Sequence, residues 1–123
     1  MILNILIILI ALEHLYFLYF EMFAWETIGK KTFRSLPAEI FRPTKALAAN
    51  QGLYNGFLAA GLIWSRLITD VEWSSNVALF FLICVAVAGI YGGITASRKI
   101  FYVQAVPALV AIGLMFVNSF PDH

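Results

Sequence analysis

Long runs of apolar residues, interrupted at only a few polar positions, dominate the chain. Four of these runs are long enough to cross a hydrocarbon core of about 30 Å as helices that rise about 1.5 Å per residue. They cover residues 2–25, 46–69, 76–97 and 101–120. We therefore predict an all-α fold, a four-transmembrane-helix bundle that forms a single integral membrane domain over residues 1–123.

The composition agrees with this pattern. Hydrophobic residues make up 62% of the 123 residues and charged residues only 12%, which is far from the norm of soluble domains. A net charge of +1 gives no indication of a nucleic-acid partner. The single cysteine, Cys84, lies inside the third run, which excludes an internal disulfide and a thiolate metal site. We expect membrane lipid around the chain and no nucleic acid.

The basic residues predict the orientation of the helices. Seven of the eight Lys and Arg residues flank or fill the connections after the first and third runs: Lys30, Lys31, Arg34, Arg42, Lys45, Arg98 and Lys99. Because connections rich in Lys and Arg stay in the cytoplasm, we place the basic 20-residue connection, residues 26–45, there and both termini outside. The first run carries two glutamates and ends without a small-residue cleavage pattern, so we interpret it as an uncleaved span.

Local structure is also expected inside the long connection. Pro37 followed by Glu39 predicts a short helical turn, since proline suits a first helical position. Apolar residues lie beside the bases at Phe33, Leu36, Ile40 and Phe41. The segment is therefore either a piece that lies at the membrane interface or a solvated basic loop.

Three ionisable residues, Glu13, His14 and Glu21, lie inside the first run. An ionisable group in a membrane-spanning helix costs roughly 2.5–3.5 kcal/mol, which calls for internal partners or a function. At about 100° per residue, with Glu13 at 0°, Glu21 falls at about 80° and His14 at about 100°. All three share one helix face, and they are our candidate catalytic residues.

The other predicted spans each carry a polar stripe. The candidate ligand-binding residues are Asn50, Gln51, Tyr54 and Asn55 in the second run, Tyr91 in the third and Gln104 in the fourth. Stripes that face a common centre would satisfy polar groups that lipid cannot. Small residues form close-approach faces at Gly52, Gly56 and Ala60 and at Gly89 and Gly93. These faces serve either packing within the bundle or a homo-oligomer interface.

The chemistry that this set favours is proton transfer. A carboxylate beside an imidazole can exchange protons with a bound molecule. A metal site is not expected, because Glu13 and His14 project about 100° apart from successive helix positions and the only other histidine is His123. The same groups can also be read as an interhelical hydrogen-bond network that only fixes the bundle. The sequence identifies no cofactor.

Two stretches of the chain resemble the signatures of a known family. Residues 13–25 and 50–61, together with Gly92, Gly93 and the segment 104–107, are similar to a bacterial and fungal family of small four-helix membrane proteins, domain of unknown function 1304. The resemblance spans nearly the whole chain. It implies a four-helix fold and a membrane setting, and it brings no activity. We expect a multi-pass location in the bacterial plasma membrane.

Two weaker resemblances are seen. Residues 42–62 are similar to helix two of the membrane glutathione-transferase-like proteins, but no acidic residue follows Asn50 in this run, which argues against glutathione binding. A carboxylate early in a short four-span chain is similar to the small multidrug resistance transporters. The basic connection and the additional His14 and Glu21 depart from that pattern.

These observations lead to one main hypothesis about function. We expect an intramembrane pocket for a small amphipathic or lipophilic molecule, with Glu13 as proton acceptor or donor and His14 as its partner. Whether the molecule is converted or only bound stays open. The alternatives are a proton-coupled small-molecule exporter and a purely structural polar network.

Overall fold

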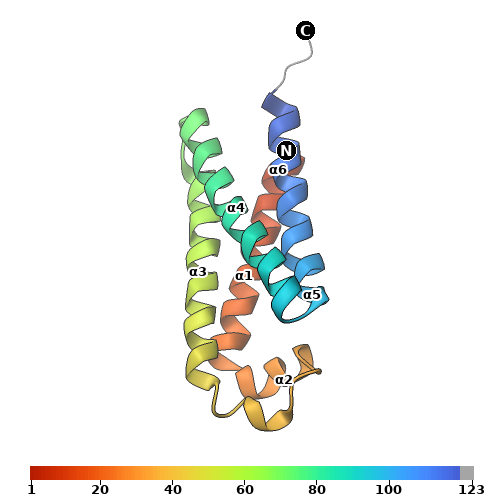
Figure 1. Ribbon diagram of the computed structural model, residues 1–123. Coiled ribbons are helices and arrows are strands. Elements are labelled where there is room, and N and C mark those ends of the chain that lie inside the picture. The colour runs from red at the N-terminus through yellow and green to blue at the C-terminus, as the bar shows by residue number, and fades with distance from the viewer. Residues whose placement is uncertain (120–123) are drawn as a thin grey trace. The chain divides into compact units, whose positions relative to one another are not determined.

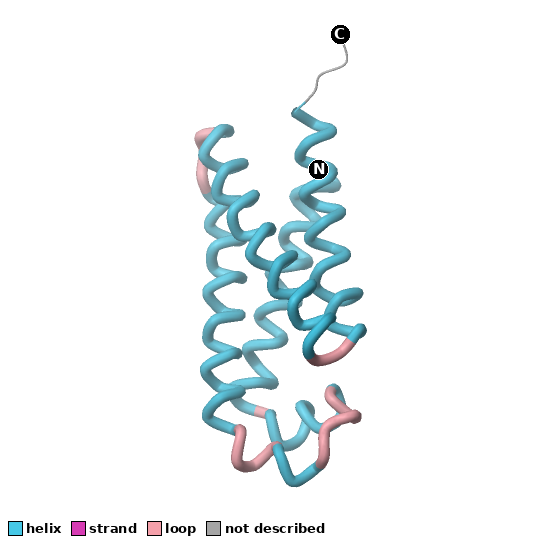
Figure 2. Tube along the Cα trace, in the orientation of Figure 1, coloured by secondary structure: helices cyan, strands magenta, loops and turns pink. Residues whose placement is uncertain are grey.

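The computed structural model describes residues 1–119. Within that range the chain is helical apart from short connections, and no strand is present (Figures 1 and 2). The elements are α1 Ile2–Phe23, the π-helical turn η1 Trp25–Gly29, α2 Lys30–Thr32, the 3-10 turn η2 Ala38–Ile40, α3 Lys45–Leu67, α4 Val71–Thr95, α5 Arg98–Ile100, the π-helical turn η3 Phe101–Ala105 and α6 Val106–Ser119. The predicted all-α fold class is confirmed.

Three helical stretches of the described residues are long and apolar enough to cross a membrane: Ile2–Phe23, Val71–Thr95 and Arg98–Asn118. Helix α3 has 23 residues, a comparable length, but it is not among them because its amide side chains lower its hydropathy. The count of four spans therefore stays a prediction. The predicted end of the last span at Phe120 lies outside the described residues.

Helix α4 begins earlier than the sequence pattern indicated. The sequence pattern predicted a span from residue 76, whereas in the structure α4 starts at Val71. The Asp70 carboxylate accepts a hydrogen bond from the backbone N–H of Trp73 at 2.9 Å. This N-cap satisfies one of the free donors of the first turn, so polar residues that look like a turn are helical.

The described chain forms two compact units, which are taken separately. Among the described residues, the first unit contains Met1–Ala11 and residues 60–119, and the second unit is Leu12–Ala59. In the first unit, α4 packs closely on η3: a Cβ on Gly89 would lie 2.5 Å from the backbone nitrogen of Ala105. Only a residue without a side chain allows this approach of two backbones.

The second unit packs the latter part of α1 against the early part of α3. A Cβ on Gly52 would lie 2.8 Å from Cγ of Met22 and 3.2 Å from the backbone oxygen of Leu18, and one on Gly56 would lie 2.5 Å from Cδ1 of Leu18. The small face of α3 therefore accepts α1 within the same chain. Gly89 likewise accepts Ala105, and a homo-oligomer through these glycines stays a prediction.

The long connection folds onto the end of this helix pair. Helix α1 stops where Ala24 leaves the helical region, at φ −141° and ψ 31°. The indole N–H of Trp25 then donates to Oγ1 of Thr44 at 3.0 Å, and its ring lies 5.0 Å from that of Phe41 between centroids. Phe41 is buried. The two ends of the connection are thereby joined.

The middle of the connection contributes to the same contacts. The ring of Phe33 packs on Trp25 at 5.7 Å and on Phe20 of α1 at 6.2 Å. The 3-10 turn Ala38–Ile40 follows Pro37 directly, as the sequence predicted. The segment is therefore an ordered part of the second unit.

Candidate functional site

Helix α1 places its three ionisable side chains on and beside one buried face. His14 has no exposed surface, Glu21 is 3% exposed, and Glu13 is half-buried. The imidazole of His14 packs edge-on against the ring of Phe17, with 5.1 Å between centroids and 65° between planes. The face that helical periodicity predicted is thus turned largely into the protein.

A buried hydrogen bond joins α1 to α3 in the second unit. Nδ2 of Asn55 donates to Oε1 of Glu21 at 2.5 Å, and Asn55 is 8% exposed. The short amide reaches the carboxyl because α1 packs closely on Gly52, where a Cβ would lie 3.0 Å from Cβ of Glu21. The small face of α3 therefore makes the polar contact geometrically possible.

Glu13 has a different environment from Glu21. Its Oε1 is buried and has no hydrogen-bond partner within residues 1–119. Eight residues at about 1.5 Å each separate Glu13 from Glu21 by about 12 Å along α1. The two carboxyls therefore do not share one proton or one small ion. An elongated molecule lying along α1 would be needed to reach both.

The remaining predicted residues do not join this buried pair. Asn50, Gln51 and Tyr54 are exposed on α3. Asn50 and Tyr54 lie about 140° and 100° from Asn55 around the helix, which turns them away from the face that meets α1. Tyr91 and Gln104 belong to the first unit, where Tyr91 is 70% exposed and Gln104 is partly buried.

The sequence analysis missed a polar cluster around Arg66 in the first unit. Nε of Arg66 donates to Oγ of Ser65 at 3.1 Å, Nη1 donates to Oδ1 of Asn4, and Nη2 donates to the backbone oxygen and Oγ of Ser74, both at 3.3 Å. Oγ of Ser74 donates in turn to the Ser65 backbone oxygen at 2.7 Å. One guanidinium thus ties together α1, α3 and α4. The signal was Asn4, a polar residue left unexplained in the first run.

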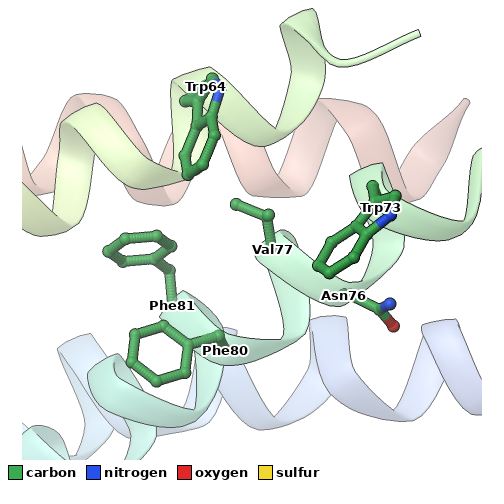
Figure 3. Close-up of a pocket in the computed structure, with 6 residues that line it drawn as sticks. All are labelled: Trp64, Trp73, Asn76, Val77, Phe80 and Phe81. Atoms are coloured by element: carbon green, nitrogen blue, oxygen red, sulfur yellow. The ribbon is translucent and has the colours of Figure 1, made fainter. Parts of the chain in front are cut away.

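An aromatic hollow opens between α3 and α4 in the first unit (Figure 3). Its volume is about 330 Å³, and it is lined by Trp64, Trp73, Asn76, Val77, Phe80 and Phe81. Trp64 on α3 faces Val77 and Phe81 on α4 across it (Figure 3). The two tryptophans belong to different helices, and the structure places them around one hollow.

No three His, Cys, Asp or Glu side chains within residues 1–119 are grouped so that they could hold a metal ion. The buried polar side chains of the second unit are the imidazole of His14, the carboxyl of Glu21 and the amide of Asn55. The arrangement can accept, hold and donate protons and hydrogen bonds.

Apolar helices long enough to span a bilayer, one of which carries buried ionisable groups, define a helical membrane protein. Residues 8–116 match the family described as protein of unknown function (DUF1304), and the chain belongs to that family. It is also 31% identical to the uncharacterized protein YpaA of Lactococcus lactis subsp. lactis (strain IL1403) over 110 residues, which are 88% of this chain and 91% of that protein. No solved structure matches the chain.

Proposed function

We propose that this protein holds a small amphipathic or lipophilic molecule at an acid/base site inside a bacterial plasma membrane. In this proposal α3 is the fourth span, both termini lie outside, and residues 26–45 lie in the cytoplasm. The 23 residues of α3 extend about 35 Å, enough to cross a hydrocarbon core. The basic connection supports the orientation, and the relative in Lactococcus lactis supports a bacterial setting.

The proposal rests on one observation about the carboxyl of Glu13. Its Oε1 is buried without a hydrogen-bond partner among residues 1–119, and a buried acceptor left in this state costs about 1–3 kcal/mol. A ligand that donates an O–H or N–H to this oxygen would offset that cost. Glu21, by contrast, already accepts from Asn55. We assign proton exchange with the ligand to Glu13 and a positioning role to Glu21.

The surroundings of Glu13 suit a ligand with an apolar body. Phe17 and Phe20 project within about 40° of Glu13 around α1, and their rings pack against each other at 6.0 Å between centroids. Neighbouring His14 is fully buried and is the second group able to take up or release a proton. The ligand class is therefore a lipophilic molecule with one hydrogen-bonding head, such as an alcohol, phenol or amine.

Mass spectrometry of molecules that co-purify with the protein tests the proposal. The wild-type chain, extracted in mild detergent, should retain a lipophilic molecule that Glu13→Leu loses. Glu13→Gln keeps an acceptor oxygen and should retain the molecule. Glu39→Gln, which removes an exposed carboxyl of the connection, is the matched control. Equal retention by the Glu13→Leu variant would contradict the assignment, provided that circular dichroism shows all variants folded.

Proton-coupled export is the second candidate, because a spanning helix with a buried carboxyl oxygen that has no hydrogen-bond partner within residues 1–119 also suits a proton carrier. Liposomes with a trapped pH-sensitive dye separate the two functions. The binding proposal expects no proton flux from wild-type protein. A flux that Glu13→Gln abolishes would favour export.

A further inference from the structure

The connection between α1 and α3 is folded, and we call it the basic cap and define it as residues 25–45. Its two ends are tied by the hydrogen bond from Trp25 to Thr44. Phe41 is 1% exposed beneath this tie, and Phe33 packs on Trp25. These contacts hold the backbone of the cap against the helix pair of the second unit. The side chains that point outward therefore form a fixed pattern.

That outward pattern is strongly basic. Five bases, Lys30, Lys31, Arg34, Arg42 and Lys45, are all exposed, against two acids, Glu26 and Glu39. Within residues 1–119, Lys45 is the one base of the cap that lies within 4 Å of a carboxylate, at 3.8 Å from Oε1 of Glu26. The other four bases have no acidic partner among the described residues.

The position of the cap in the chain brings this charge to a membrane surface. Helix α1, which is long and apolar enough to span a bilayer, ends at Phe23, and the cap starts two residues later. Leu36 and Ile40 are 39% and 37% exposed beside the bases. Apolar side chains interspersed with bases are typical of segments that lie at the level of lipid headgroups.

We propose that the basic cap is a binding surface for anionic phospholipid headgroups. Guanidinium groups pair with phosphate oxygens in a bidentate way, and each base near a membrane surface strengthens the binding of a basic segment to anionic lipid by on the order of fivefold. The inference is independent of the Glu13 site. It differs from a topology signal because a topology signal needs only the number of charges, whereas a binding surface also needs the folded cap.

Fluorescence quenching by brominated lipids tests this surface. The chain has three tryptophans, so Trp64→Phe with Trp73→Phe leaves Trp25 as the reporter inside the cap. In nanodiscs of phosphatidylcholine and phosphatidylglycerol, bromination is placed on one lipid at a time. We expect brominated phosphatidylglycerol to quench Trp25 several-fold more strongly than brominated phosphatidylcholine at equal mole fraction.

Matched variants connect the effect to the cap. Lys30→Gln with Lys31→Gln should reduce the preference for phosphatidylglycerol. Arg98→Gln with Lys99→Gln removes the same amount of charge from α5, outside the cap, and should leave the preference for phosphatidylglycerol unchanged. Thr44→Val keeps every charge, loosens the tie to Trp25, and should also reduce the preference. Native mass spectrometry of the chain with all its tryptophans, counting retained phosphatidylglycerol, gives a second readout. Equal quenching by both lipids, or equal losses in the two charge variants, would overturn the proposal.

Discussion

Replacing Asn55 by leucine removes the donor of the buried hydrogen bond to Glu21 and nearly conserves volume. Glu21 is 3% exposed, so water does not replace the lost amide. Interhelical hydrogen bonds in membrane proteins contribute about 0.6 kcal/mol on average, but leaving a buried acceptor without its donor costs about 1–3 kcal/mol. The second effect is larger. We therefore expect Asn55→Leu to lower the free energy of unfolding by about 1–3 kcal/mol.

Two companion variants separate the hydrogen bond from packing. Glu21→Gln keeps an acceptor oxygen for Nδ2 of Asn55 and should change the free energy of unfolding by no more than about 0.6 kcal/mol. The double variant Glu21→Leu with Asn55→Leu has no buried polar group at this place. It should be more stable than Asn55→Leu alone, since replacing both partners by apolar groups is nearly neutral.

Reversible unfolding in mixed micelles, with sodium dodecyl sulfate as denaturant and circular dichroism as the signal, measures these differences. The double-mutant cycle gives the coupling free energy between the two side chains. If Glu21→Leu and Asn55→Leu lower the free energy of unfolding additively, the two side chains do not interact and the reasoning fails. An Asn55→Leu variant as stable as wild type would refute it equally.

Two further predictions concern the first unit. Gly89→Ala should lower the free energy of unfolding by about 1–3 kcal/mol, because the new Cβ would lie 2.5 Å from the backbone nitrogen of Ala105. Gly113→Ala is the control, because its Cβ would meet nothing within 4 Å. It should leave the free energy of unfolding unchanged or raise it slightly in the same assay. Arg66→Lys should lower the melting temperature in detergent more than Arg98→Lys, because an ammonium cannot reproduce the planar guanidinium that donates to both Asn4 and Ser74. Equal shifts in melting temperature would contradict this role of the Arg66 guanidinium.

Local features of the structure could be predicted from the sequence. An apolar run longer than about 20 residues has few alternatives to a helix in a membrane, and the helix fixes which of its own residues share a face. The common face of Glu13, His14 and Glu21 followed from this periodicity, and the short turn after Pro37 followed from the preference of proline for a first helical position. The start of α4 was missed because Asp70 acts as an N-cap, and polar cap residues look like a turn in sequence.

The partner of each face was decided by tertiary packing. The sequence analysis expected the polar stripe of the second run to face the centre of the bundle. Periodicity alone does not decide whether this stripe or the small residues Gly52 and Gly56 meet α1. In the second unit α1 packs on the small face at Gly52 and Gly56, because small residues let backbones approach where lipid offers no hydrophobic gain. Asn55, which borders that face, therefore reaches Glu21, and Asn50 and Tyr54 stay exposed.

The same distinction explains the Arg66 cluster. Asn4 is 62 residues from Arg66 in the sequence. Asn4, Arg66 and Ser74 also lie on three different helices, so no spacing rule within one helix connects them. They come together in the first unit, where one guanidinium has donors for all of its partners. Helix length and helix face are set by neighbours within about one or two turns, which a sequence contains. A contact between helices depends on which faces pack, and only the folded chain determines that.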